Sequence, residues 1–266
     1  MTGKIYVGIG GWTYEPWRGT FYPEKLPHAR ELEHAGTRVT AIEINGTYYR
    51  LQSAKSFAGW AKAVPDGFKF SVKASRYCTN RKVLAEAGES IEKFVGQGLV
   101  ELGDRLGPIL WQFATTKQYD PDDFKVFVDL LPASHDGVKL RHAVEPRHES
   151  FRDPGFVAML RKAGVGLVFA DATDHPCFAD LTGNFVYARL QDAKVDEATG
   201  YAPKDLDRWT GIAQAWAKGE APEGLPYAGA PDDSAGKARD TFVFMINGAK
   251  LRAPAAAEAM LAKLKL

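Results

Sequence analysis

The residues best placed to do chemistry lie in one short stretch, residues 139–151, which reads KLRHAVEPRHESF. This pattern predicts a strand that ends in a carboxylate and a guanidinium. Because side chains alternate between the two faces of a strand, Glu145 and Arg147 share one face, while His142 lies on the helix-facing side. A Glu or an Arg is costly to bury without a partner. The two side chains therefore either form a structural ion pair or line a polar cavity, and both interpretations stay open at this point.

The rest of the chain alternates apolar strands with helices. Besides the strand above, strands are predicted over residues 5–9, 39–45, 68–74, 108–113, 165–171, 185–191 and 241–247. Helices are predicted over 24–36, 53–64, 90–106, 121–131, 153–163, 204–218 and 254–266, and residues 219–240, rich in Gly and Pro, are expected to form a mobile surface segment. This alternation predicts an α/β protein with a parallel sheet, and its length fits a single-domain (β/α)8 TIM barrel over residues 1–266. An open doubly wound sheet is the alternative.

Polar side chains recur at the ends of the predicted strands. In a parallel barrel these ends meet at one mouth, where catalytic groups are placed. Nine residues are expected there on the face of Glu145, and they are Glu43, Asn45, Lys73, Gln112, Glu145, Arg147, Asp171, Arg189 and Asn247. Because their carboxylates and cations are equal in number, a network that satisfies only itself is the alternative to a functional site.

Composition limits the class of protein. The 266 residues are 45% hydrophobic and 25% charged, which is typical of a soluble globular protein, and the net charge of +1 gives no support to nonspecific polyanion binding. The two cysteines have no CxxC spacing and are expected to be free thiols. The N-terminus enters a strand at once, and no apolar run approaches the roughly 20 residues that span a bilayer. We therefore expect a cytoplasmic protein with no membrane contact.

The loop after the first strand, residues 10–27, is crowded with aromatic side chains, among them Trp12, Tyr14 and Trp17. A loop this aromatic has to pack on something. It is either a plug over one end of the core or a stacking wall over a ligand. The residues leave both interpretations open.

The sequence does not favour a metal site. Glu43, Glu145, Asp171 and His148 have the right ligand types for a divalent ion. Three cations at the same rim would repel such an ion, and the six histidines are scattered. The sequence therefore predicts no metal and no cofactor, and it gives no positional support to a Ser/His/Asp triad.

Several blocks of the chain resemble the YecE-like family, known as domain of unknown function seventy-two. The blocks, which span nearly the whole chain, are GIGGWTYEPWRGTFYP, AIEINGTYYR, GPILWQF, AVEPRHESF, ARLQDAKVDEATGY and FMINGA. The resemblance implies a TIM barrel and leaves the biochemical role open. The positions that match the family pattern are Trp12, Tyr14, Trp17, Gly19, Phe21, Tyr22, Pro23, Glu43, Asn45, Lys73, Gln112, Glu145, Arg147, His148, Arg189 and Asn247.

The chain departs from the family pattern at the rim. Asn80 and Gln191 stand where the family usually has histidines, and strand eight ends in Ile246-Asn247-Gly248 instead of Asn-Asn-Asp. These departures weaken any metal cluster rich in histidine.

The favoured hypothesis is an enzyme, such as a hydrolase, lyase or isomerase, that acts on a small anionic substrate, either phosphorylated or sugar-like. Glu145 and Glu43 would act as general acid or base. Arg147, Arg189 and Lys73 would hold the anion, in the manner of the phosphate sites of other barrels. The alternative for Arg189 is that it neutralises Glu145 or Asp171. Two further hypotheses are a nucleic-acid-binding or repair barrel resembling metal-dependent endonucleases, which the neutral charge counts against, and a non-catalytic binding protein.

Overall fold

Eight parallel strands close into a barrel in the computed structural model, which describes residues 2–231 and 236–266. Around the barrel the strand order is β1-β10-β9-β8-β7-β4-β3-β2. The strands are β1 (Ile5–Gly10), β2 (Ala41–Ile44), β3 (Lys69–Lys73), β4 (Leu106–Gln112), β7 (His142–Glu145), β8 (Gly166–Asp171), β9 (Phe185–Leu190) and β10 (Asp240–Met245). All eight were predicted from the sequence, so the (β/α)8 barrel is confirmed and the open sheet is excluded.

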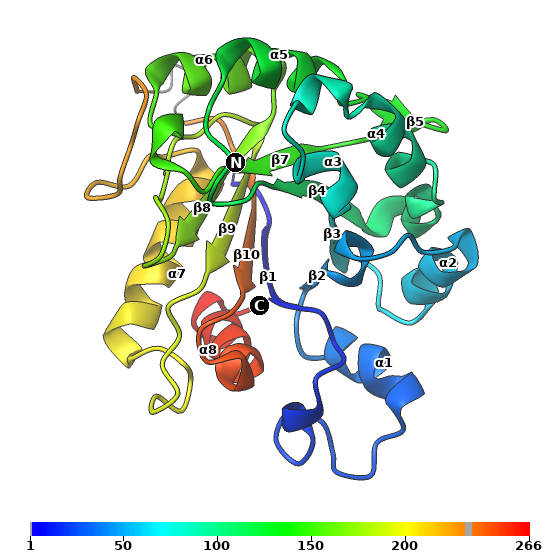
Figure 1. Ribbon diagram of the computed structural model, residues 1–266. Helices are drawn as coiled ribbons and strands as arrows, with labels where there is room; N and C mark the ends of the chain where they lie inside the picture. The colour runs from blue at the N-terminus through cyan, green and yellow to red at the C-terminus, as the bar shows by residue number, and fades with distance from the viewer. Residues whose placement is uncertain (1, 232–235) are drawn as a thin grey trace.

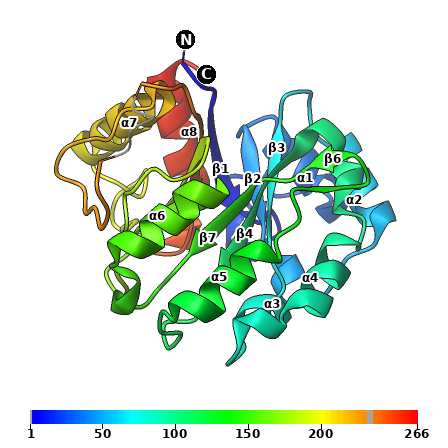
Figure 2. The same cartoon turned by 90° about the horizontal axis from the view of Figure 1, so that it is seen from above.

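Helices surround the strands, as Figures 1 and 2 show. They are α1 (Glu31–Gly36), α2 (Ala54–Lys62), α3 (Arg76–Thr79), α4 (Gly88–Val95), α5 (Pro121–Asp129), α6 (Pro154–Ala163), α7 (Pro203–Lys218) and α8 (Ala253–Leu264). No helix among the described residues is both long enough and apolar enough to cross a membrane.

Two helices are shorter than the sequence predicted. The helix expected over 24–36 begins only at Glu31, after Pro27 and a single 3-10 turn. The helix expected over 90–106 ends at Val95, and a 3-10 segment follows from Leu99. The break is at Gly98, whose φ of 100° is left-handed and whose missing Cβ would lie 2.6 Å from Cα of Ala54 in α2.

A small hairpin outside the barrel was not predicted. It joins β5 (Ser134–His135) to β6 (Val138–Lys139) through Asp136 and Gly137. Both turn residues have positive φ, of 45° and 76°, as an Asp-Gly hairpin turn requires.

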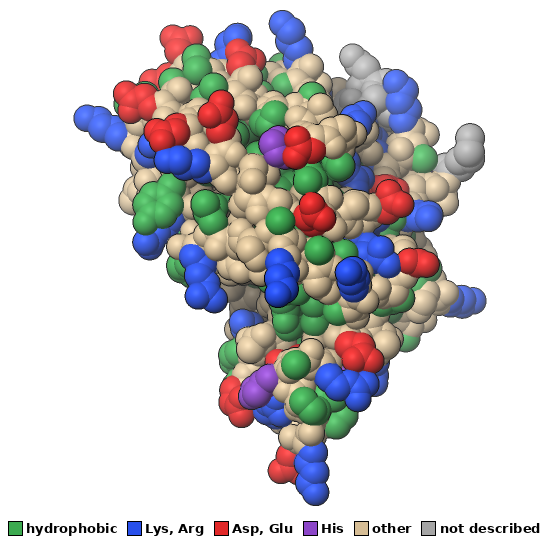
Figure 3. Space-filling view, turned by 90° about the vertical axis from the view of Figure 1, so that its right-hand side faces the viewer, with side chains coloured by type: hydrophobic (Ala, Val, Ile, Leu, Met, Phe, Trp, Pro, Cys, Tyr) green, Lys and Arg blue, Asp and Glu red, His purple; other side chains and the backbone are tan. Residues whose placement is uncertain are grey.

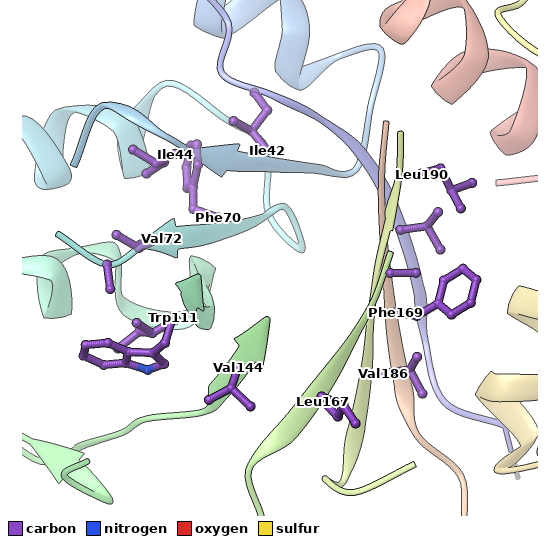
Figure 4. Close-up of a cluster of buried hydrophobic side chains, with 14 of the residues drawn as sticks. Ile42, Ile44, Phe70, Val72, Trp111, Val144, Leu167, Phe169, Val186 and Leu190 are labelled. Carbon is purple, nitrogen blue, oxygen red and sulfur yellow. The ribbon is translucent and has the colours of Figure 1, made fainter. Parts of the chain in front are cut away.

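The two faces of the strands pack differently. Outward side chains, including Val144, Leu167 and Phe169, join the main apolar cluster between barrel and helices, shown in Figure 4. Inward side chains, including Ala143 and Tyr187, form a second cluster inside the barrel. The alternation predicted for residues 142–147 is therefore confirmed. His142 faces the helices, where Nε1 of Trp111 donates to its Nδ1 at 3.1 Å.

The segment before β10 is anchored where it is described. The expected mobile segment, residues 219–240, includes residues 232–235, which lie outside the described residues. In the described part, backbone N–H groups of Ala228 and Gly229 donate to the buried carboxylate of Asp180, at 2.8 and 2.9 Å. Leu225 is also buried. A lack of apolar periodicity concealed these contacts, because the carboxylate of Asp180 binds irregular backbone here.

Replacing Asp180 should loosen this anchor. In Asp180→Ala two half-buried N–H groups lose their acceptor, so the free energy of unfolding should fall by about 1–3 kcal/mol. Asp180→Asn retains one oxygen and should lose less. Urea denaturation followed by tryptophan fluorescence measures both, and equal stability of Asp180→Ala and the wild type would contradict the anchoring role.

Candidate functional site

A buried guanidinium lies at the centre of the candidate site. Arg189, near the end of β9, is only 2% exposed, and it lies between two glutamates that come from other strands. Its Nε and Nη2 each donate to Glu43 at 3.0 Å. Its Nη1 donates to both carboxylate oxygens of Glu145, at 3.0 and 2.8 Å. All three guanidinium nitrogens are therefore bonded within the protein.

The network extends downward from Glu43 into the barrel. The hydroxyl of Tyr187 donates to Glu43 at 2.7 Å and lies 2.6 Å from Oγ of Ser71. Oγ of Ser71 also lies 2.8 Å from the backbone oxygen of Pro108, and its single proton serves either that oxygen or the Tyr187 hydroxyl. With Tyr187 and Arg189 as donors, each oxygen of Glu43 accepts a hydrogen bond.

Both carboxylate oxygens of Glu145 also accept hydrogen bonds from other side chains. Nε and Nη2 of Arg147 donate to its Oε1 at 2.9 and 2.7 Å, and Nε2 of Gln112 donates to its Oε2 at 2.9 Å. Burial alone would raise the pKa of Glu145, but the charges of Arg189 and Arg147 outweigh burial and lower that pKa to about 2. Glu145 is thus ionised at neutral pH.

A pocket of about 590 Å³ opens above this network at the barrel mouth. Tryptophan and amide side chains contribute to its wall, among them Trp12, Trp17, Trp60, Asn45, Gln52, Gln112 and Asn247. The charged side chains that line it are Arg50, Lys73, Arg147, Arg189 and Lys250. Among the described residues, no Asp or Glu lines this pocket.

Lys73, at the end of β3, has the most perturbed amine in the pocket. Its Nζ donates to Oε1 of Gln112 at 2.8 Å and lies 4.3 Å from the ring centroid of Tyr48. Burial, and then the charge of Arg189, lower the pKa of Lys73 to about 8, against the opposing effect of the two buried glutamates. About one tenth of this amine is therefore unprotonated at pH 7, and about half at pH 8.

The aromatic loop divides between the core and the wall of the pocket. Trp17 is fully buried, and its Nε1 donates to the backbone oxygen of Lys250 at 3.0 Å, so it closes one side of the core. Trp12 lines the pocket and packs edge-on against Trp60 with ring centroids 5.2 Å apart. Tyr14 contacts the ring of Trp17, and Nζ of Lys250 lies 4.5 Å from the Tyr14 ring centroid.

Most of the predicted site residues come together, in two levels. Trp12, Asn45, Lys73, Gln112, Arg147, Arg189 and Asn247 line the pocket. Glu43 and Glu145 lie beneath it, at 0% and 1% exposure, and reach it only through the side chains that they hold. Strand parity placed all of these residues except Trp12, a loop residue, at one end of the barrel. Parity does not distinguish the side chains that line the pocket from those that lie beneath it.

Asp171 is an exception, and its predicted orientation is wrong. In the register of β8 with β9, Ala170 pairs with the inward Arg189, whereas Asp171 pairs with the outward Leu190. Its carboxylate accepts the backbone N–H groups of Gln191 and Asp192, at 2.5 and 3.1 Å. Asp171 therefore caps the end of β9 and does not line the pocket. The prediction counted the alternation of faces from the last polar residue of the strand. Counting from Val168, which points into the barrel, gives the observed orientation.

His148 also lies outside the pocket lining. Its Nδ1 accepts the backbone N–H of Ser150 at 3.1 Å and so caps a single 3-10 turn, Glu149–Phe151. Among the described residues, no group of three or more His, Cys, Asp or Glu side chains is placed to hold a metal ion. Gln191 accepts from Nδ2 of Asn247 at 3.1 Å.

Sequence reasoning missed several members of the site. Ser71 and Tyr187 lie on the inward parity of their strands, so their place was available from the same count that located Arg189. Arg50, Trp60 and Lys250 come from a loop, a helix and a 3-10 turn. No periodicity marks such positions.

Comparison with known proteins places the chain among relatives of the same fold. The family model described as "Protein of unknown function DUF72" matches residues 6–266. A crystal structure of a DUF72 family protein from Thermotoga maritima MSB8 has a TM-score of 0.73 at 21% identity, covering 99% of this chain and all of that one. A second, from Enterococcus faecalis V583, has a TM-score of 0.71 at 17% identity, covering 99% and 98%.

A curated relative matches over part of the chain. The UPF0759 protein YunF of Bacillus subtilis (strain 168) is 26% identical over 114 residues, which is 41% of this chain and 39% of that protein. The matched segment is thus well under two thirds of the length of YunF. The two crystal structures show the fold, and neither their names nor that of YunF states a substrate.

Removing the central guanidinium should cost much of the stability. Arg189→Met leaves the buried Glu43 without a cation and leaves Glu145 with Arg147 alone, so we expect a loss of about 3–5 kcal/mol at pH 7. The loss should shrink toward pH 4, where the two glutamates of the variant take up protons. Denaturant unfolding at both pH values measures it. As a control, the triple variant Arg189→Met, Glu43→Gln, Glu145→Gln should recover part of the loss; no recovery would attribute the effect to packing.

Asp171 should make the fold less stable as pH rises, which is opposite to the effect of Glu145 with its lowered pKa. Burial raises the pKa of Asp171 to about 7, in spite of its two backbone donors. A raised pKa stabilises the fold below about pH 4, and this contribution disappears as pH rises toward 7. Asp171→Asn keeps an acceptor oxygen and should gain on the order of 2–4 kcal/mol relative to wild type between pH 4 and pH 8. Parallel curves for the two proteins over this range would contradict the raised pKa.

Proposed function

We propose that this chain, which belongs to the DUF72 family of proteins of unknown function, binds a small anionic substrate in the pocket at the barrel mouth. In this proposal Lys73 transfers a proton to or from that substrate. The family suggested by the sequence blocks is confirmed by the match over residues 6–266. That family has no established activity, so support for a function has to come from the pocket itself.

The observation that carries the proposal is the charge of the lining. Five cationic side chains line the pocket, and within the described part of the chain no carboxylate lines it. Of these cations Arg50 is exposed and Lys250 is half-buried, with its Nζ 4.5 and 5.8 Å from the ring centroids of Tyr14 and Trp17. Cations without carboxylate partners at the wall of a pocket favour a negatively charged ligand.

A helix end supports the same proposal. Ala253, the first residue of α8, contributes to the pocket wall. The N-terminus of a helix presents backbone N–H groups and a partial positive charge, both of which stabilise a bound anion. The backbone before α8 is less accessible, because the N–H of Ala249 already donates to the backbone oxygen of Ala193 at 3.0 Å.

Lys73 fits the role of proton carrier better than the two glutamates expected from the sequence. Every oxygen of Glu43 and Glu145 already accepts hydrogen bonds, and neither side chain lines the pocket. A general acid or base has to reach the substrate and to titrate near the working pH. Lys73 meets both conditions, with a lowered pKa of about 8 and a place in the lining. In this proposal the glutamates hold Arg189 and Arg147 in position.

Anion titrations test the proposal. Wild-type protein titrated with inorganic phosphate or a sugar phosphate to 100 times Kd should gain about 2.7 kcal/mol, which raises Tm by roughly 5–10 °C. Arg147→Met and Lys73→Met should weaken this response. Lys69→Met is the matched control, since Lys69 begins the same strand at the opposite end of the barrel. If all four proteins respond alike, the anion is not bound in this pocket.

A further inference from the structure

The amine of Lys73 has surroundings that suit covalent chemistry as well as proton transfer. Within the part of the chain that the structure describes, Lys73 forms no ion pair, although Glu145 lies on the far side of Gln112. Its hydrogen-bonded partner is a neutral amide, and its other close neighbour is the ring of Tyr48. An amine held in this way keeps its nitrogen available to a molecule in the pocket.

An amine acts as a nucleophile only in its neutral form. The lowered pKa of Lys73, about 8, means that close to half of the amine is neutral at pH 8. An ordinary lysine, with a pKa near 10.4, is under about 1% neutral at that pH. The physical cause is the burial of Lys73 together with the neighbouring Arg189, and both are properties of the fold.

We propose that Lys73 forms an imine with the carbonyl carbon of a small aldehyde or ketone that also carries a carboxylate or phosphate. This inference rests on the proposed function, which supplies the binding site for the anionic group. The lone pair of Nζ attacks the carbonyl carbon, and the oxygen takes up the proton that nitrogen gives up. The C–O bond of this adduct then breaks with a second proton from solvent. Water leaves, and a protonated imine remains.

The pocket provides for the rest of such a substrate. Arg147 and Lys250 line the same pocket and would hold the anionic group, while Trp12 and Trp60 contribute apolar surface. A volume of about 590 Å³ is enough for a molecule of a few carbon atoms with its anionic group. A positively charged imine nitrogen would take the place of the ammonium near the buried glutamates, so the charge of the site would stay the same.

Reductive trapping tests the imine. The protein is incubated at pH 8 with cyanoborohydride and either glyoxylate, which carries a carboxylate, or glycolaldehyde phosphate. Acetaldehyde is the neutral compound matched to glyoxylate, and glycolaldehyde is matched to glycolaldehyde phosphate. The rate of adduct formation with each compound is divided by its rate with free N-acetyl-lysine, which corrects for its intrinsic reactivity. We expect one equivalent of adduct, on the peptide that contains Lys73, at least ten times faster with an anionic compound than with its neutral partner.

Two lysine variants locate the adduct. Lys73→Arg keeps the charge but has no nucleophilic amine, and it should lose the fast single adduct. Lys69→Arg removes an amine at the opposite end of the same strand, outside the pocket, and should keep the fast single adduct. Adducts spread over surface lysines, or equal rates in Lys73→Arg and wild type, would overturn the inference. Protection by phosphate against trapping would support it.

The outcomes separate this inference from the proposed function. If phosphate stabilises the wild type through Arg147 but no adduct forms at Lys73, then the pocket binds anions and the imine is wrong. If phosphate fails to stabilise the wild type, the anion site itself is wrong, and any adduct at Lys73 should then show no preference for anionic compounds. The compound that reacts faster, glyoxylate or glycolaldehyde phosphate, identifies which anionic group the site favours.

Discussion

The arrangement of the barrel mouth depends on one buried guanidinium. Arg189 lies between Glu43 and Glu145, which come from β2 and β7, so its hydrogen bonds cross the barrel interior and connect three strands. Removing three charged groups from water costs several kcal/mol for each ion, and this cost is offset only when each donor and acceptor is matched. The planar fork of arginine can meet two carboxylates in this way, whereas a lysine ammonium cannot.

This network determines what the pocket above it can bind. Because Glu43 and Glu145 are both committed to Arg189, neither carboxylate reaches the wall of the pocket. The two carboxylates beneath the floor of the pocket form ion pairs with Arg189 and Arg147. Within the described residues, the rim cations Arg50 and Lys250 have no carboxylate partner. The same buried ion pairs that hold the strands together thus leave the mouth positively charged, in a protein whose net charge is only +1.

That positive mouth is a local feature. The face of the molecule in Figure 3 carries Lys and Arg side chains interspersed with Asp and Glu, and no large field of one sign covers it. A small anion that enters the pocket would meet cations on several sides, whereas a long polyanion would meet both signs on such a face.

The sequence predicts the barrel and the location of the site, but not the partners within it. Eight apolar runs with turn residues between them define the strands, and the alternation of faces along β7 places Glu145 and Arg147 correctly. The alternation of faces gave the wrong orientation for Asp171, because the alternation has to be counted from a residue known to point into the barrel. It also says nothing of partners across the barrel. That Arg189 would bind Glu43 and Glu145, and not Asp171, follows from the closure of the sheet, which is a long-range property.

Gln112 separates Lys73 from the buried carboxylates while it holds both. Its Oε1 accepts from Lys73 and its Nε2 donates to Glu145. Lysine has only donors and an ionised carboxylate has only acceptors, so the amide has a single orientation that satisfies both neighbours. A carboxylate at this position would pair directly with Lys73 and raise its pKa. The neutral amide connects Lys73 to Glu145 through two hydrogen bonds and adds no negative charge. Lys73 therefore remains in the neighbourhood of Arg189 with a pKa of about 8, and the protein has an amine at the mouth that can lose its proton near neutral pH.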